Sequence, residues 1–292
     1  MTAQCQLVES LGPDGRPFAV VAVPTAGRYT AALTCSLPDS PSVQAELADR
    51  WALRLAAEPD VAQATVSVEY AAGADRAVAR IAISRAYGGG SGARRKAGPG
   101  AAGWFSSQLP LWARYLVSEG AGQVRAADPA DLCVLARLAY DPSIAAFLAG
   151  GRAPVPEWTD VPPAAFREPW ARFEHEGAAS VTWSLSPEVT SGSLPEILAW
   201  CAARPAGASA GRVSVLAAPA PAGDEPSVRQ GALVTLTGPA DDEWAAQATE
   251  SLAARPRIAL RPAYGMQAGA FIAALPLGFG GTRLIRTPRV GK

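Results

Sequence analysis

One order of strand and helix patterns occurs twice along the chain, and this repeat constrains the fold more than any other feature. Alternation with period two marks strands, and apolar residues at helical spacing mark helices. In the first half the expected elements are strand 29–37, helix 42–57, strands 63–71 and 76–85, helix 104–118 and strand 123–126. In the second half they are strand 178–186, helix 193–204, strands 211–218 and 230–238, helix 240–255 and strand 257–262. Each half therefore has the order β-α-β-β-α-β.

This order is that of the ferredoxin-like split unit, so we predict an α+β chain of two tandem ferredoxin-like (βαββαβ) modules with antiparallel sheets. A helix and a Pro-rich linker are expected to join the modules. The predicted boundaries are 14–127 for the first module, 128–177 for the helix and linker, 178–281 for the second module and 282–292 for a basic tail. A fold of this kind hosts many functions and implies none.

Composition favours a folded chain and gives no sign of a nucleic-acid partner. Of the 292 residues, 49% are hydrophobic, too many for intrinsic disorder. The 26 Lys and Arg balance the 26 Asp and Glu, so the net charge gives no reason to expect binding to nucleic acid. The longest uncharged stretch, 263–282, contains Gly, Gln and Pro and falls short of a membrane span. We therefore expect a soluble, cytoplasmic chain whose four Cys are reduced.

The residues needed for catalysis or for a metal site do not occur together in this sequence. The only His, His175, lies in a charged segment and is expected to be a solvated surface residue. The Cys are too widely spaced for a zinc cluster. A G-x-S-x-G pattern at 207–211 follows a helix and precedes a strand, the reverse of a nucleophile elbow. We therefore predict no enzyme, no metal and no cofactor.

A glycine pattern leaves one alternative open. Residues Gly98 to Gly103 read G-x-G-x-x-G just before a helix, as in a dinucleotide-binding loop. About a dozen residues separate this pattern from the preceding strand, whereas a dinucleotide site needs a tight turn there. A disordered basic loop containing Arg94, Arg95 and Lys96 accounts better for the segment. A nucleotide-binding protein is kept as an alternative.

Five short segments carry a resemblance to a known family. They are 14–19 (DGRPFA), 29–33 (YTAAL), 138–142 (LAYDP), 180–183 (SVTW) and 264–278 (YGMQAGAFIAALPLG). Together they resemble the soluble portion of a family of actinobacterial membrane proteins encoded in conjugative elements beside a conjugation ATPase. The last segment is similar to the end of the N-terminal, non-ATPase module of type IV secretion ATPases. It also resembles the cytosolic domain of the EccE component of type VII secretion.

The resemblance implies a non-enzymatic, structural or assembly component of an actinobacterial conjugation (type IV-like) secretion apparatus. Such a component would contact a secretion ATPase and other subunits of the machine at the inner membrane. An EccE-like component of type VII secretion is the alternative. The family begins with two membrane helices that this sequence lacks, so the expected location is peripheral, at the inner face of the cell membrane, through a partner or a missing anchor.

The C-terminal segment supplies the predicted contact residues. An apolar helical stripe there is expected either to pack in the core or to dock a partner. The predicted docking residues are Gln267, Phe271, Leu275, Pro276 and Leu277. The basic tail is predicted to contact anionic lipid through Arg283, Arg286, Arg289 and Lys292. Trp158 and Trp170 are large aromatics in the polar linker and suggest a protein contact.

Overall fold

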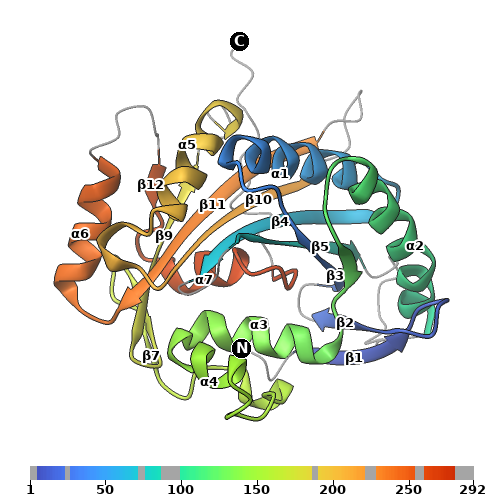
Figure 1. Cartoon of the computed structure of the whole chain (residues 1–292), viewed down its shortest axis with the longest axis horizontal. Coiled ribbons are helices and arrows are strands. Elements are labelled where there is room, and N and C mark those ends of the chain that lie inside the picture. Colours follow the sequence, from blue (N-terminus) through green and yellow to red (C-terminus); the bar gives the residue numbers. More distant parts are fainter. Residues whose placement is uncertain are drawn as a thin grey trace.

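A computed structural model shows how these elements assemble (Figure 1). It describes residues 5–23, 27–71, 76–86, 99–185, 190–220, 228–253 and 260–279. The strands are β1 (Gln6–Leu11), β2 (Pro17–Val23), β3 (Arg28–Ser36), β4 (Val61–Ala71), β5 (Val78–Ala86), β6 (Val124–Ala126), β7 (Phe166–Arg167), β8 (Phe173–His175), β9 (Ala178–Leu185), β10 (Ala210–Pro219), β11 (Val228–Pro239) and β12 (Leu260–Pro262).

Seven α-helices occur in the described ranges. They are α1 (Pro41–Ala56), α2 (Pro99–Ser118), α3 (Pro129–Tyr140), α4 (Ala145–Ala149), α5 (Thr190–Ala202), α6 (Asp242–Ala253) and α7 (Gln267–Ala273). Local sequence explains several boundaries. Asp128 begins α3 with a reciprocal capping box, in which Asp128 and Asp131 each accept the backbone N–H of the other.

The strands form one continuous 12-stranded sheet, with the order β1-β2-β3-β5-β4-β10-β11-β9-β8-β7, β6 beside β3 and β12 beside β9. The two halves of the chain meet where β4 pairs with β10, antiparallel, from Ala64 opposite Ala217 to Ala71 opposite Ala210. The prediction of two tandem ferredoxin-like modules joined by a helix and linker is therefore wrong. Either half alone would leave a long apolar strand, β4 or β10, at an open sheet edge, and their mutual pairing removes both edges.

One large core lies on the side of the sheet covered by α1, α2, α5 and α6 (Figure 1). It includes residues from both halves of the chain, with Trp51, Phe105, Trp183 and Trp200 among its largest fully buried side chains. Helices α1 and α5, one from each half, pack against each other above the β4–β10 junction. The shared core therefore continues across the junction.

The opposite side of the sheet carries both apolar and polar side chains, and it is also buried, because α3, α7 and the residues after α7 cover it. Ser67 of β4 and Ser214 of β10 lie 2.9 Å apart, hydroxyl to hydroxyl, and Ser214 donates to the carbonyl of Ala274 at 2.6 Å. Polar residues that alternate with apolar ones along a strand usually mark a face open to solvent. Here their hydroxyl groups pair with one another and with the backbone of the covering segment, which satisfies their hydrogen bonds without water.

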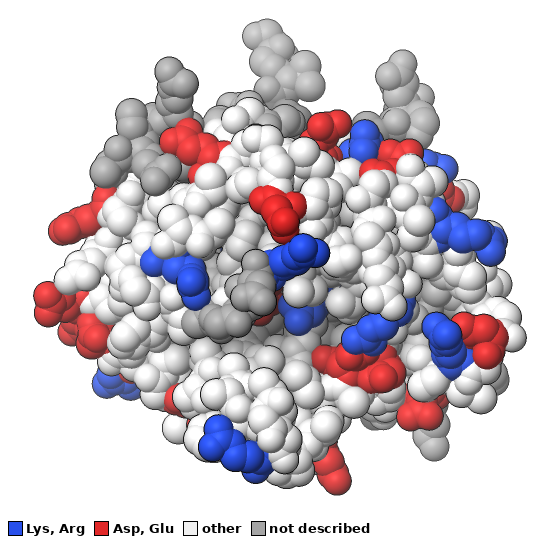
Figure 2. All heavy atoms as spheres, in the orientation of Figure 1, with Lys and Arg blue, Asp and Glu red and all other residues white. Residues whose placement is uncertain are grey.

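Charged side chains of both signs are interspersed on the face shown in Figure 2, around a hollow near its centre. No single helix in the described part of the chain is long and apolar enough to cross a membrane. One bent pair, Pro129–Tyr140 with Pro142–Ala149, reaches the required length and composition only when the two helices are taken together across a 120° bend.

Candidate functional site

The structure buries all five residues predicted to dock a partner. Gln267 is the first residue of α7, Phe271 lies in its middle, and Leu275, Pro276 and Leu277 follow it. Gln267 and Phe271 are both 0% exposed. The prediction of a docking surface at these residues is corrected, because their side chains pack beneath the sheet and offer no face to a partner.

Gln267 is held by the backbone of β9. The Thr182 N–H donates to Gln267 Oε1 at 2.8 Å, and Gln267 Nε2 donates to the Thr182 carbonyl at 3.2 Å. This edge of β9 pairs with β8 on one side of Thr182 and with β12 on the other. The side-chain amide thus fills the gap that these two short strands leave and satisfies buried backbone groups.

The other predicted site residues are placed as follows. Arg283, Arg286, Arg289 and Lys292, predicted to contact lipid, lie outside the described residues, as does Gly98. The rest of the glycine pattern, residues 99–103, forms the beginning of α2, where a dinucleotide site would need a tight turn after a strand.

His175 is buried, and the expectation of a solvated surface histidine is wrong. It lies on β8 and is 2% exposed. Its Nδ1–H donates to the Tyr140 carbonyl at 2.5 Å, a tautomer assigned from the network because a carbonyl only accepts. Nε2 lies 2.9 Å from Ser180 Oγ, which in turn lies 2.8 Å from Thr237 Oγ1. Burial lowers the pKa of His175 and keeps the ring neutral.

The cysteines do not form a reactive site. All four are buried, and Cys35, Cys133 and Cys201 take part in no disulfide. Burial raises the pKa of Cys35 to about 12 and that of Cys133 to about 11, which keeps both as thiols. In the described ranges, no three His, Cys, Asp or Glu side chains come together in a way that could hold a metal ion.

The clearest surface feature is a set of exposed apolar side chains on two segments that contact each other, Phe166 and Trp170 on one and Tyr264 and Met266 on the other, which we call the aromatic ridge. Their exposures are 67%, 70%, 48% and 51%. The Trp170 and Tyr264 rings stack with centroids 6.1 Å apart and an interplanar angle of 8°. The ridge therefore joins two segments that are almost a hundred residues apart in sequence.

Backbone contacts hold these two segments together. The Gly265 N–H donates to the Trp170 carbonyl at 2.9 Å, and the Ala268 N–H donates to Glu168 Oε1 at 2.9 Å. Gly265 has φ +67°, and a Cβ at this position would lie 2.7 Å from the Trp170 ring. Glycine is thus required both by the backbone conformation and by the close approach of the ring.

An apolar pocket of about 400 Å³ adjoins the ridge at Phe166, and we call it the aromatic pocket. Phe166 lies over Phe173, with ring centroids 6.1 Å apart. The pocket is lined by Tyr140, Trp158, Val161, Pro162, Pro163, Phe166, Phe173, Ala268, Leu277 and Phe279. The arrangement can hold apolar groups but brings together no nucleophile, base and oxyanion donor.

Sequence reasoning found this region only in part. Trp158 and Trp170 stand out as aromatics in a polar segment, and Trp158 does line the aromatic pocket. Tyr264 and Met266 belong to the C-terminal segment, whose sequence does not single them out as surface residues. Trp170 and Tyr264 carry no local signal that they will meet, since their contact depends on how β12 pairs with β9.

Comparison with family models finds no match for this chain, and comparison with curated proteins finds none either. Among solved structures, the chain is similar to 6-hydroxy-D-nicotine oxidase from Arthrobacter nicotinovorans, at 14% identity over 88% of this chain and 51% of that one, with a TM-score of 0.36. It is also similar to aspartate kinase from Synechocystis, at 13% identity over 81% and 43%, with a TM-score of 0.20. The chain spans about half the length of these proteins or less, and TM-scores this low carry no argument about function.

Proposed function

We propose that this chain is a non-enzymatic assembly component of an actinobacterial conjugation (type IV-like) secretion apparatus. In this proposal it binds the partner ATPase through the aromatic ridge and the aromatic pocket, at the inner face of the cell membrane. The family resemblance supports the kind of machine. The observation that carries the binding role is Trp170, which is 70% exposed and yet fixed in a stack on Tyr264.

Exposed Trp and Tyr side chains are the residue types that contribute most to protein interfaces. Large apolar side chains gathered on a surface mark interaction sites more often than scattered ones do. The ridge is also held in place, by the Gly265 contact with Trp170 and by the Glu168 contact with Ala268. Binding a partner would therefore cost the ridge little conformational entropy, which favours affinity.

Direct binding to the ATPase encoded beside this chain tests the proposal. We expect titration calorimetry to show binding that Trp170→Ala and Tyr264→Ala each weaken at least 10-fold, since truncating an interface hot spot costs about 2 kcal/mol or more. Phe147→Ala is the matched control, because Phe147 is a half-exposed aromatic on α4, outside the ridge. Circular dichroism should show all three variants folded.

Unchanged affinity in both ridge variants, or an equal loss in the Phe147 control, would contradict the assignment of the ridge. If the chain instead bound type VII subunits and not the conjugation ATPase, it would be an EccE-like component. The C-terminal segment resembles both systems, so the choice of partner distinguishes them.

A further inference from the structure

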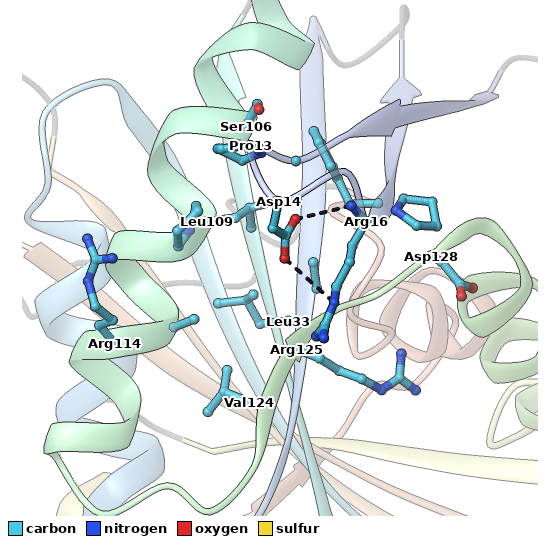
Figure 3. A pocket seen from close by; sticks show the side chains of 16 residues that line it. Pro13, Asp14, Arg16, Leu33, Ser106, Leu109, Arg114, Val124, Arg125 and Asp128 are labelled. Carbon is cyan, nitrogen blue, oxygen red and sulfur yellow. Dashed lines mark hydrogen bonds and ion pairs between the residues drawn. The ribbon is translucent and has the colours of Figure 1, made fainter.

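A second cavity, separate from the ridge, opens where β3 changes its neighbour. β2 pairs with β3 as far as Val20 opposite Ala31, and β6 takes over at Ala126 opposite Leu33. Between them, Ala127 bridges the two edges: its carbonyl accepts from Ala19 N–H at 2.8 Å and its N–H donates to the Ala32 carbonyl at 2.9 Å. The diverging strands leave a cavity of about 460 Å³ beneath α2, which we call the α2 pocket (Figure 3).

The floor of the α2 pocket is apolar and tightly packed. Phe18, Leu33 and Leu109 line it, and all three are at most 4% exposed. The remaining lining residues come from the turn between β1 and β2, from α2 and from the segment around β6: Gly12, Pro13, Asp14, Arg16, Pro17, Ser106, Pro110, Ala113, Arg114, Val124, Arg125, Ala126 and Asp128. A volume of this size is typical of sites for small molecules.

The turn that forms one wall is held in place. Gly12 N–H donates to the Arg16 carbonyl at 2.8 Å, and Gly15 N–H donates to the Gly12 carbonyl at 3.0 Å. Ser106 Oγ donates to the Leu11 carbonyl at 3.1 Å, which ties the turn to α2. The pocket is therefore preformed, and a ligand would not have to order it.

Three arginines and two aspartates line the pocket, and their partners differ. Arg125 forms a bidentate ion pair with Asp131. Asp128 accepts the Asp131 N–H as the cap of α3. Arg16 has only an exposed ion pair with Asp14, at 3.7 Å from its Nε.

Arg114 is exposed on α2, and Figure 3 shows its side chain on the outer side of that helix, away from Asp14 and Arg16. Arg16 is therefore the cation placed to meet a ligand inside the pocket. Figure 3 shows its side chain extending along the pocket, with Asp14 facing it. Exposed ion pairs of this kind contribute about 0–1 kcal/mol, so a ligand anion can replace Asp14 with little loss. A guanidinium also matches the two oxygens of a carboxylate.

We propose that the α2 pocket binds a compact amphipathic carboxylate. Its apolar body would lie on Phe18, Leu33 and Leu109, and its carboxylate would pair with Arg16. Such a ligand requires an apolar floor and a cation beside it. An uncharged analogue would keep the apolar contacts but lose the ion pair with Arg16. The proposal concerns a site distinct from the aromatic ridge.

Titration calorimetry with 2-naphthoate tests it, with uncharged 2-naphthamide as the ligand control. We expect 2-naphthoate to bind, and both the amide and the Arg16→Gln variant to weaken binding at least 5-fold. Ala113→Trp, which places a large side chain at the pocket wall, should abolish binding. Arg152→Gln is the protein control, because Arg152 is an exposed arginine outside the pocket, and it should leave binding unchanged.

Absence of 2-naphthoate binding at millimolar concentration would overturn the proposal. Binding that survives Ala113→Trp would place the ligand elsewhere and overturn it too. Binding that Ala113→Trp abolishes but Arg16→Gln leaves unchanged would overturn the carboxylate assignment. Circular dichroism on each variant confirms that a loss of binding is not a loss of fold.

Discussion

Replacing Gln267 by Met should destabilise the fold rather than abolish a contact with a partner. The Gln267 amide is 0% exposed and is the partner of the Thr182 N–H. Met keeps much of the volume but leaves this buried N–H without an acceptor, at a cost of about 1–3 kcal/mol. The Thr182 carbonyl keeps its bond from the Ala263 N–H at 2.9 Å, so loss of the second amide bond adds only about 1 kcal/mol.

We therefore expect Gln267→Met to lower the free energy of unfolding by about 2–4 kcal/mol. With a urea m-value of about 3 kcal/mol/M, the midpoint of unfolding should fall by about 1 M at unchanged m. Tryptophan fluorescence and circular dichroism follow the transition. Gln247→Met is the matched control, because Gln247 is an exposed glutamine on α6, and its effect should stay within about 0.5 kcal/mol.

Gln267→Glu adds a pH signature. A neutral Glu can still donate to the Thr182 carbonyl, whereas an ionised one faces that carbonyl without a proton and is buried. The pKa of this Glu should therefore be raised in the fold above its unfolded value of about 4.3. The variant should approach wild-type stability near pH 4 and lose it as pH rises through the raised pKa. Equal urea midpoints for wild type and Gln267→Met, or a Gln267→Glu variant indifferent to pH, would refute the reasoning.

Three further results are expected. Burial lowers the pKa of His175, so below about pH 6.5 the unfolded chain binds a proton that the folded chain does not, and wild-type stability should fall as the pH drops through that value. Urea midpoints of His175→Gln should lack this fall. Glu69 forms ion pairs with both Arg80 and Arg212, and the Arg212 side chain is 5% exposed, so Glu69→Gln should lower the free energy of unfolding in urea by about 3–5 kcal/mol. A loss below about 1 kcal/mol would contradict the structural role of this cluster. Gly278 has φ +74° and its Cβ would collide with a hydroxyl of β3, so calorimetry should show Gly278→Ala destabilised by about 1–3 kcal/mol, whereas an unchanged melting temperature would refute the strain.

The sequence predicts many of the longer elements because their signals are local, but it misses β1 and also β7 and β8, which lie in the segment predicted to be a linker. Helix 42–57 corresponds to α1 at Pro41–Ala56, and strand 63–71 to β4 at Val61–Ala71. The backbone geometry of a helix or a strand sets a period of 3.6 or of 2, and burial of one side makes that period visible in the order of apolar residues. Strand 29–37 likewise corresponds to β3 at Arg28–Ser36.

What the sequence could not predict is which edges and faces meet. β4 and β10 pair across about 150 residues, and nothing local distinguishes such a pair from two solvent-facing edges. Ser67 and Ser214 have the polarity of a wet face, yet Ala274 covers them. The apolar stripe around Phe271 predicts burial against an apolar surface but does not identify that surface. In the structure it is the sheet of the same chain.

The β4–β10 ladder has a consequence for how the chain comes off the ribosome. β4 is complete by residue 71, but its partner begins only at residue 210. Through the synthesis of the residues between them, the nascent chain carries a long strand with one unpaired side, the kind of edge that recruits other chains. Such a distant pairing also slows folding. A chaperone that shields this strand would therefore prevent aggregation most effectively during that interval. A chain truncated before β10 should accumulate as aggregates rather than as a folded first half.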